Sequence, residues 1–348
     1  MATRAETLAA IDRLATKHER LIARGFLEAV GRIRDVATLG AIEAAFLRGP
    51  EAVARLFSDE ALASAAGALE QAIGEAALDG ARNTAATTAP VPNSRGVIAE
   101  FTFNAGNPRL GTFIEQNTTR RIREVSEGVK ATIRTVVRQE TTAGVNPNQA
   151  ARRIRDSIGL TERQELAVNN FEKMLRNIEN RDADRLARAL ANDELRVLRD
   201  RRYDRTIVAA ARRGEPLSEQ QISTMVERYR KRYIDYRART IGRTEAIRSL
   251  NGAAREYMSE QVSRGRVDAR QVRRFWVHTR DDRTRVDHTK IADLNPDGVG
   301  LNEPFETPTG ERLMYPGDAG GRPENVINCR CMVYQRVVPF ELVGGGAE

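Results

Sequence analysis

The sequence has few of the side chains on which most active sites depend. Its 348 residues include 2 cysteines, 3 histidines and 1 tryptophan, and aromatic residues make up only 5% of the chain. Cys329 and Cys331 are separated by one residue and cannot cross-link distant parts of a fold, which excludes a protein held together by disulfides. So little cysteine fits synthesis in a reducing cytoplasm.

Long hydrophobic runs and enzyme signatures are missing as well. No stretch approaches the roughly 18 apolar residues of a membrane-spanning helix, and the start MATRAETLAAIDRLATKHERL lacks the apolar core of a signal peptide. The sequence holds no glycine-rich phosphate loop, no HExxH motif, no Gly-x-Ser-x-Gly elbow and no second carboxylate pair at a useful spacing. We therefore expect neither a membrane partner nor an enzyme.

Most of the chain is rich in residues that favour helices. Charged residues make up 30% and apolar residues 41% of the sequence, and apolar side chains recur at helical spacing up to about residue 270. Long helices are predicted over 112–142 and from 219 to about 262, the second either continuous or broken near Gly242. Residues with the pattern of helix N-caps are Ser58, Thr161 with Gln164, and Ser218 with Gln221.

The last part of the chain has a different pattern. The segments FWVHT (275–279) and NVINCRCMVYQRVV (325–338) predict strands, and DDRTRVDHTKIADL (281–294) predicts a short helix capped by Asp281 or Asp282. A hairpin is expected around Thr309-Gly310. We therefore predict a mainly α fold, with an extended helical body followed by a small α+β C-terminal domain.

Composition divides the chain into five consecutive regions. Pro, Gly, Thr and Asn between 83 and 111 indicate a linker, in which Val97–Phe103 has the composition of a short strand. The predicted regions are an N-terminal helical region (1–82), this linker or extended segment (83–111), a basic helical body (112–270), the α+β domain (271–338) and a disordered tail (339–348).

Positive charge is concentrated in the helical body. The net charge is +8 overall, with −1 over residues 1–110, +6 over 111–217, +7 over 218–274 and −4 over 275–348. A basic helical surface can neutralise phosphates without reading bases, so we expect nonspecific contact with double-stranded DNA. The same pattern is typical of helices whose charges are simply solvated. The residues predicted to contact DNA are Arg120, Arg121, Arg123, Arg228, Arg230, Lys231 and Arg232.

Four blocks of residues occur in a recognisable order near the end of the chain. They are RTEAIRSLNGAARE (243–256), Trp276 followed by Asp281-x-Arg283-x-Arg285-x-x-His288, Phe305 with the Pro316-Gly317-Asp318 turn, and Asn328-Cys329-Arg330-Cys331. In this order they resemble the phage Mu F-like minor head proteins, also called phage head morphogenesis proteins. The matched residues of the first block are Arg243, Thr244, Glu245 and Asn251. Residues 1–110 carry no such resemblance.

The resemblance implies a structural protein of a tailed phage or a phage-like particle. Members of that family are made in the host cytoplasm, join the head in few copies with the portal protein, act in head morphogenesis and can contact packaged DNA. For this chain the resemblance therefore implies a virion location, a partner in the portal or the capsid interior, and no catalytic activity.

The histidine and the cysteines of these blocks are also suitable metal ligands. His288, Cys329 and Cys331 would suit zinc, with Asp281 or His278 as the fourth ligand. Such a site requires the segment around His288 to fold against the final strand, where the two cysteines would lie on one side. The other interpretation is a buried cluster in which His288 bonds a backbone carbonyl or Asp281, and the cysteines pack as small hydrophobes.

Other interpretations of the same residues stay open. Asp281, Arg283, Arg285 and Glu245 could form a charged network that pins the small domain to the long helix. Asp281, His288 and the Cys-x-Cys pair could instead serve a metal-dependent hydrolase or nuclease. A third functional hypothesis is a cellular nucleic-acid-binding scaffold without a role in a virion. We expect Trp276 to anchor the core of the small domain.

Overall fold

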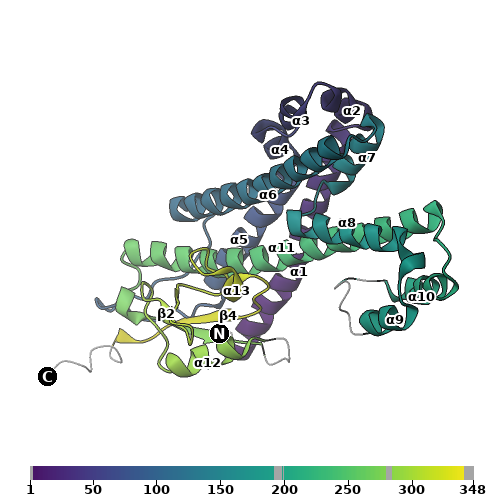
Figure 1. Ribbon diagram of the computed structural model, residues 1–348. Helices are drawn as coiled ribbons and strands as arrows, with labels where there is room; N and C mark the ends of the chain where they lie inside the picture. The colour runs from purple at the N-terminus through teal and green to yellow at the C-terminus, as the bar shows by residue number, and fades with distance from the viewer. Residues whose placement is uncertain (1–2, 192–197, 199, 280–283, 341–348) are drawn as a thin grey trace. The chain divides into compact units, whose positions relative to one another are not determined.

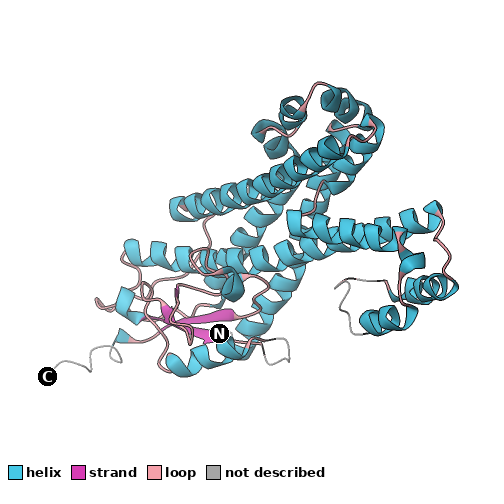
Figure 2. Cartoon of the chain, viewed as in Figure 1, coloured by secondary structure: helices cyan, strands magenta, loops and turns pink. Residues whose placement is uncertain are grey.

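The computed structural model describes residues 3–191, 198, 200–279 and 284–340, and it consists mainly of helices (Figure 1). Helices account for 69% of the chain, and the few short antiparallel strands lie near the C-terminus (Figure 2). The predicted fold class, mainly α with a small α+β part at the C-terminal end, is confirmed. Within the described ranges, every helix is too short or too polar to cross a membrane.

The long helices include both of those predicted from the sequence. They are α1 (Arg4–Val36), α5 (Gly67–Thr87), α6 (Pro108–Ala143) and α11 (Glu219–Ser263). The shorter helices are α2 (Leu39–Leu47), α3 (Pro50–Leu56), α4 (Asp59–Ala65), α7 (Pro147–Ser157), α8 (Glu162–Arg176), α9 (Ala183–Ala191), α10 (Asp204–Arg213), α12 (Val286–Leu294) and α13 (Pro323–Val326). Single 3-10 turns are η1 (Ile178–Asn180), η2 (Arg201–Tyr203) and η3 (Ala269–Gln271).

The chain forms two compact units, each built from separate stretches of sequence. Unit 1 comprises residues 1–26, 66–122 and 238–348, and unit 2 comprises residues 27–65 and 123–237. The boundaries between the stretches fall at or inside helices, where the composition of the chain does not change. The five regions drawn from composition divide the chain along its length, and each packed unit draws on several of them.

The predicted N-caps form the hydrogen bonds that were expected of them. Thr161 Oγ1 accepts from Gln164 N at 3.3 Å and Gln164 Oε1 accepts from Thr161 N at 3.0 Å, which closes a capping box at α8. Ser218 and Gln221 make the same pair of bonds at α11. Ser58 Oγ accepts from the third amide of α4. These bonds satisfy amides that the first turn of a helix leaves without an intrahelical partner.

Of the two alternatives for the helix around Gly242, continuous or broken, the continuous one is correct, because α11 runs without interruption from Glu219 to Ser263. In unit 1 a Cβ on Gly242 would lie 2.3 Å from the carbonyl oxygen of Glu19 in α1 and 3.2 Å from Ala23 Cβ. A Cβ on Gly80 in α5 would likewise lie 2.6 Å from the carbonyl oxygen of Leu250. These glycines therefore permit close approach of α1 and α5 to α11 instead of ending a helix.

The C-terminal part of unit 1 contains two small antiparallel sheets. β1 (Val272–Val277) pairs with β4 (Met332–Val337) along its full length. β2 (Phe305–Glu306) pairs with β3 (Arg312–Leu313) and forms the predicted hairpin around Thr309-Gly310. The strands gather with α12 and α13 beside the unit 1 part of α11 (Figure 1). Trp276 on β1 is 3% exposed and packs edge-on against Phe305, so it anchors this core as expected.

The final strand is shorter than predicted. β4 begins at Met332, because α13 occupies 323–326 and the backbone of Asn328 is left-handed, with a φ of 59°. Asn328 is the one non-glycine residue of the described chain with a positive φ, a conformation that asparagine tolerates better than most residues. Cys329 and Cys331 therefore lie in the turn that leads into β4 and not inside a strand.

Two further local predictions are wrong. α12 begins at Val286 with Arg285 at its N-cap position, and the predicted caps Asp281 and Asp282 lie outside the described residues. Between α5 and α6 the chain forms an isolated bridge from Pro92 to Ile98 but no strand over 97–103. Of the tail predicted to be disordered, 341–348 lies outside the described residues.

Candidate functional site

The residues of the first block lie on the face of α11 that contacts the C-terminal turns and strands. Thr244 and Asn251 are 2% and 4% exposed and lie seven residues apart, two helical turns along one face. Thr244 Oγ1 accepts a hydrogen bond from Asn328 N at 3.0 Å. Asn251 Oδ1 accepts from Val333 N at 3.0 Å, and its Nδ2 donates to the carbonyl oxygen of Pro316 at 3.4 Å. The first block thus holds the backbone of the third and fourth blocks.

The Pro316-Gly317-Asp318 turn fits closely against α11. Arg248 Nε donates to the carbonyl oxygen of Gly317 at 2.6 Å. Gly317 has a φ of 83°, and a Cβ there would lie 3.2 Å from the Cα of Arg248. Asp318 completes the turn, because its two carboxylate oxygens accept from Met314 N at 2.8 Å and from Gly320 N at 3.0 Å. Glycine is required at 317 both for its backbone conformation and for its lack of a side chain.

Glu245 is the centre of a buried charge network in unit 1. Arg121 and Arg248 both donate to its Oε1, and Arg120 Nη2 lies 3.9 Å from its Oε2. Burial by itself would raise the pKa of Glu245, but the positive charges of Arg121, Arg248 and Arg120 outweigh burial and lower the pKa. The network ties α6 to α11 through an ionised carboxylate that is 0% exposed.

The charged network that the sequence predicted around Glu245 consisted of different residues from those observed. It joined Glu245 to Arg285, but Arg285 donates to the carbonyl oxygen of Ile327 instead. Asp281 and Arg283, the remaining predicted members, lie outside the described residues. Sequence reasoning missed Arg248, because nothing in an arginine-rich helix distinguishes a buried guanidinium from a solvated one. Its position three residues after Glu245, on the same helix face, is the signal that could have found it.

His288, Cys329 and Cys331 come together in the interior of unit 1, as the metal interpretation requires. His288 Nδ1 lies 3.5 Å from Cys329 Sγ and 3.4 Å from Cys331 Sγ. The three residues are 2%, 1% and 1% exposed, and their ligand atoms all lie within 4.8 Å of one another. Over the described ranges, no other group of His, Cys, Asp and Glu is close enough to hold a metal ion. His278 does not belong to the cluster, and Asp281 lies outside the described residues.

The two thiols have unequal hydrogen-bonding partners. Hydrogen bonds from the Cys331 thiol and from His288 hold the pKa of Cys329 well below its usual range. The hydrogen bond to Cys329, together with burial, raises the pKa of Cys331. These partners favour the thiolate form at Cys329 over Cys331, and the thiolate is the form that binds metals and acts as a nucleophile.

A cleft of about 370 Å³ borders Cys329. Arg243 and Arg330, residues of the first and fourth blocks, also line it, together with Thr279. Arg243 is held by Glu19 on the cleft wall, to which it donates from Nε at 3.1 Å and from Nη2 at 2.6 Å. The buried cluster thus borders this cleft through Cys329.

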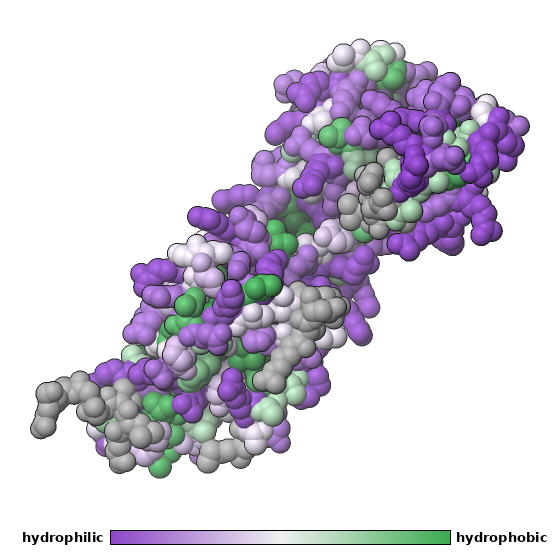
Figure 3. Space-filling model, turned by 60° about the horizontal axis from the view of Figure 1, so that its bottom comes forward, coloured by the Kyte–Doolittle hydropathy of each residue, from purple (hydrophilic) through white to green (hydrophobic). Residues whose placement is uncertain are grey.

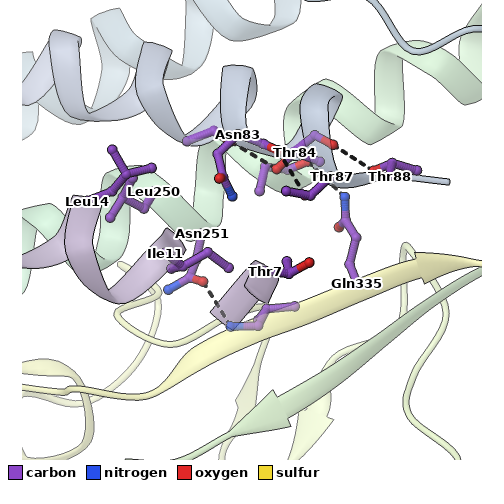
Figure 4. A pocket seen from close by; sticks show the side chains of 13 residues that line it. Thr7, Ile11, Leu14, Asn83, Thr84, Thr87, Thr88, Leu250, Asn251 and Gln335 are labelled. Atoms are coloured by element: carbon purple, nitrogen blue, oxygen red, sulfur yellow. Dashed lines mark hydrogen bonds between the residues drawn. The ribbon is translucent and has the colours of Figure 1, made fainter. Parts of the chain in front are cut away.

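A second cavity of unit 1 is too small to be a ligand site. It lies among α1, α5, α11 and β4 and holds about 30 Å³ (Figure 4). Around it lie the hydrogen bond from Val333 N to Asn251 and threonine hydroxyls of α5, which donate to main-chain carbonyls (Figure 4). This volume has room for on the order of one or two water molecules.

Arg274 on β1 is a buried functional group that the sequence did not single out. It is 1% exposed, its Nε and Nη2 donate to the carbonyl oxygen of Gly300, and it also bonds the carbonyl oxygens of Met314 and Glu303. Burial lowers the pKa of Arg274 to about 10. The guanidinium group lies 5.3 Å from the ring centre of Phe305. Arg274 therefore fastens β1 to the loop that carries β2 and β3.

Most of the residues predicted to contact DNA are paired with carboxylates. Arg120 and Arg121 belong to the Glu245 network, and the Arg121 side chain is only 14% exposed. In unit 2 the remaining pairs are Arg230 with Asp156 at 3.2 Å, Lys231 with Asp235 at 2.7 Å and Arg232 with Asp200 at 3.6 Å.

Arg123 and Arg228 are the other two predicted DNA contacts. Both are exposed, and neither has a carboxylate partner in the part of the chain that the structure describes. The face of the molecule in Figure 3 is largely hydrophilic, as expected of a surface covered by charged helices.

Comparison of the chain with protein-family models, with curated proteins and with solved structures found no match. The resemblance to the phage Mu F-like minor head proteins therefore stays a prediction that rests on the four sequence blocks.

Proposed function

We propose that this chain is a structural, non-catalytic component of the head of a tailed phage or phage-like particle, a minor head protein. The observation that carries the proposal is the meeting of the four blocks of the resemblance in unit 1. Thr244 of the first block binds Asn328 of the fourth, and His288 of the second contacts both cysteines of the fourth. Residues that a family shares are expected to meet in this way when they specify one fold.

The nature of these contacts supports a structural role. Thr244, Glu245 and Asn251 are buried, and they bond to main-chain atoms or to other buried charges. A catalytic group must be reachable by its substrate, whereas a group that specifies packing need not be. The first block therefore serves mainly to dock the C-terminal segment on α11.

Within such a particle, the chain would join the portal protein or the capsid interior and contact packaged double-stranded DNA without sequence preference. The exposed arginines Arg123 and Arg228 of unit 2 are suited to phosphate contact, which needs positive charge and no base recognition. The protein would be made in the host cytoplasm and would leave it as part of the virion.

The test uses particles purified from a host that carries the gene and from a host in which it is deleted. We expect the chain to sediment with wild-type particles and to bind immobilised portal protein. Deletion of its gene should reduce the number of DNA-filled heads. Asn251→Ala, which removes the bonds to Pro316 and Val333, should lower incorporation into particles. Asn180→Ala, at an exposed asparagine of unit 2, should be incorporated normally.

Three outcomes would contradict this proposal. One is a normal yield of filled particles from the deletion host together with absence of the chain from wild-type particles. Metal-dependent DNA cleavage that is lost in His288→Ala would instead favour the hydrolase or nuclease hypothesis. Binding to DNA without binding to portal protein or particles would favour a cellular scaffold.

A further inference from the structure

We propose that His288, Cys329 and Cys331 bind one zinc ion, and that the ion fastens α12 to the turn before β4. The proposal does not depend on the head-protein function, because it rests on the arrangement of the three side chains. It assigns His288 Nδ1 and the two Sγ atoms as the ligand atoms.

The distances between the three donor atoms are those of a tetrahedral metal site. Zinc binds thiolates at about 2.3 Å and imidazole at about 2.0 Å, so a nitrogen and a sulfur on the same ion lie about 3.5 Å apart. The two Nδ1–Sγ distances are 3.5 and 3.4 Å. The sulfur atoms lie within 4.8 Å of each other, which leaves room for the sulfur–sulfur edge of about 3.8 Å.

Hydrogen bonding alone explains this arrangement less well. An imidazole nitrogen has either one proton or one lone pair, so it can form one well-directed hydrogen bond in the plane of the ring. His288 Nδ1 nevertheless lies at almost equal distance from two sulfur atoms. An ion between the three atoms would bind all of them at once.

The donor set favours zinc among the common cellular metal ions. Two thiolates and one imidazole are soft or borderline ligands, whereas calcium and magnesium require oxygen ligands. The site is also buried, with all three residues at most 2% exposed. Zinc has no redox chemistry and is commonly bound by thiolate and imidazole; the three protein ligands would leave the fourth position of the tetrahedron to water or a further ligand.

Bonds that do not involve a metal fix the backbone beside the ligands. His288 lies in the first turn of α12, where Arg285 at the N-cap position donates to the carbonyl oxygen of Ile327. The left-handed Asn328, whose amide is bound by Thr244, turns the chain so that Cys329 and Cys331 both reach His288. Residues in rare backbone conformations persist where the surroundings require them, often at functional sites.

The hydrophobic core around the cluster is small, so a bound metal ion would add substantially to its stability. Apart from the cysteines it consists of Trp276, Ile291, Val299, Phe305 and Leu313. It is covered by sheets of only two strands each, and such sheets are marginally stable by themselves. Small units of this kind commonly gain their missing stability from a structural metal.

The experiment measures the metal content of the full chain. The protein is expressed with zinc in the medium, dialysed against metal-free buffer and analysed by plasma mass spectrometry. We expect about one zinc ion per chain in the wild type, and nearly none in His288→Gln or in Cys329→Ser/Cys331→Ser. His278→Gln is the matched control, because it changes a histidine outside the cluster, and it should retain the metal.

A second measurement on the wild type guards against variants that fail to fold. Replacement of zinc by cobalt should give the absorption of tetrahedral cobalt with a thiolate charge-transfer band. Removal of the metal by a strong chelator should lower the melting temperature by about 5 °C or more, and added zinc should restore it. The proposal is overturned if the wild type binds neither zinc nor cobalt, or if the double cysteine variant keeps its zinc.

Discussion

Buried charges that have specific partners are the strongest single-residue constraints in unit 1. Glu245 is fully buried and bonded by Arg121 and Arg248, and Arg274 donates to main-chain carbonyl oxygens. A buried ion pair stabilises a fold little when compared with apolar packing, but the loss of one partner is costly because a charge stays buried without compensation. Only a packing of unit 1 that keeps these partners in place is therefore stable.

The first prediction concerns Glu245. Glu245→Gln should lower the free energy of unfolding by about 3 kcal/mol, because it leaves Arg121 and Arg248 without a counter-charge. Arg264→Gln, at the residue that follows the last residue of α11, is the control: its ion pair with Glu260 is 43% exposed on the arginine side, and its loss should cost less than about 0.5 kcal/mol. Urea unfolding of both variants checks this, and equal losses would contradict the network.

The pKa of Glu165 in unit 2 is shifted upward, whereas the pKa of Glu245 is shifted downward. Burial raises the pKa of Glu165 to about 7, although Arg230 and Arg153 favour the charged form. Because the folded state then holds its proton more tightly than the unfolded state, the stability of unit 2 should fall as pH rises from about 4.5 to about 7. The fall is roughly 2–3 kcal/mol.

Urea unfolding across this pH range measures the effect. Glu165→Gln should remove most of the slope, since its amide does not titrate; Glu140, whose pKa burial also raises, contributes the rest. Glu227→Gln, at an exposed position of α11 in unit 2, should leave the slope as it is in the wild type. A slope that survives undiminished in Glu165→Gln would assign the pH dependence to other groups.

At the level of helices and strands, glycine has two uses that look alike in a sequence. Gly242 and Gly80 lie inside helices at places where another backbone passes closely. Gly111 in α6 has nothing within 4 Å of where its Cβ would be. In the first case a side chain would force two helices apart, and in the second it would only lower the entropy of the unfolded chain.

Alanine substitutions should therefore have effects of opposite sign. Gly242→Ala should lower the free energy of unfolding by about 2 kcal/mol or more, because its Cβ would meet the carbonyl oxygen of Glu19. Gly111→Ala should raise it by up to about 1 kcal/mol. Thermal unfolding of the two variants side by side checks this, and a stabilised Gly242→Ala would show that α1 and α11 are not so close.

For the molecule as a whole, the net charge of +8 predicts binding to double-stranded DNA. Affinities for unrelated sequences should be similar, and the logarithm of the binding constant should fall linearly with the logarithm of salt concentration. Arg123→Ala/Arg228→Ala should reduce this slope by about 1–2.

The control for this prediction is Arg312→Ala/Arg322→Ala. It removes the same charge from exposed positions in the acidic C-terminal segment and should leave the slope unchanged. Fluorescence anisotropy titrations at several salt concentrations measure both. Equal slopes for the two double variants would mean that Arg123 and Arg228 do not contact phosphate.

Local patterns in the sequence were sufficient to predict most of the helices, their caps and the fold class. The capping boxes at Thr161 and Ser218, the β2–β3 hairpin and the long α6 were correct, because each depends on interactions between residues a few positions apart. The candidate ligands His288, Cys329 and Cys331 could also be chosen from the sequence, because the chain has only 2 cysteines and 3 histidines.

Only the tertiary structure decided which distant residues meet. It placed Arg121 and Arg248 on Glu245, showed that Gly242 is a packing position inside a continuous helix, and brought His288 to the two cysteines. It also formed two units from separate stretches of chain, with boundaries at or inside helices. Burial, charge pairing and close backbone approach depend on segments far apart in sequence, and composition and spacing carry no record of which segments these are.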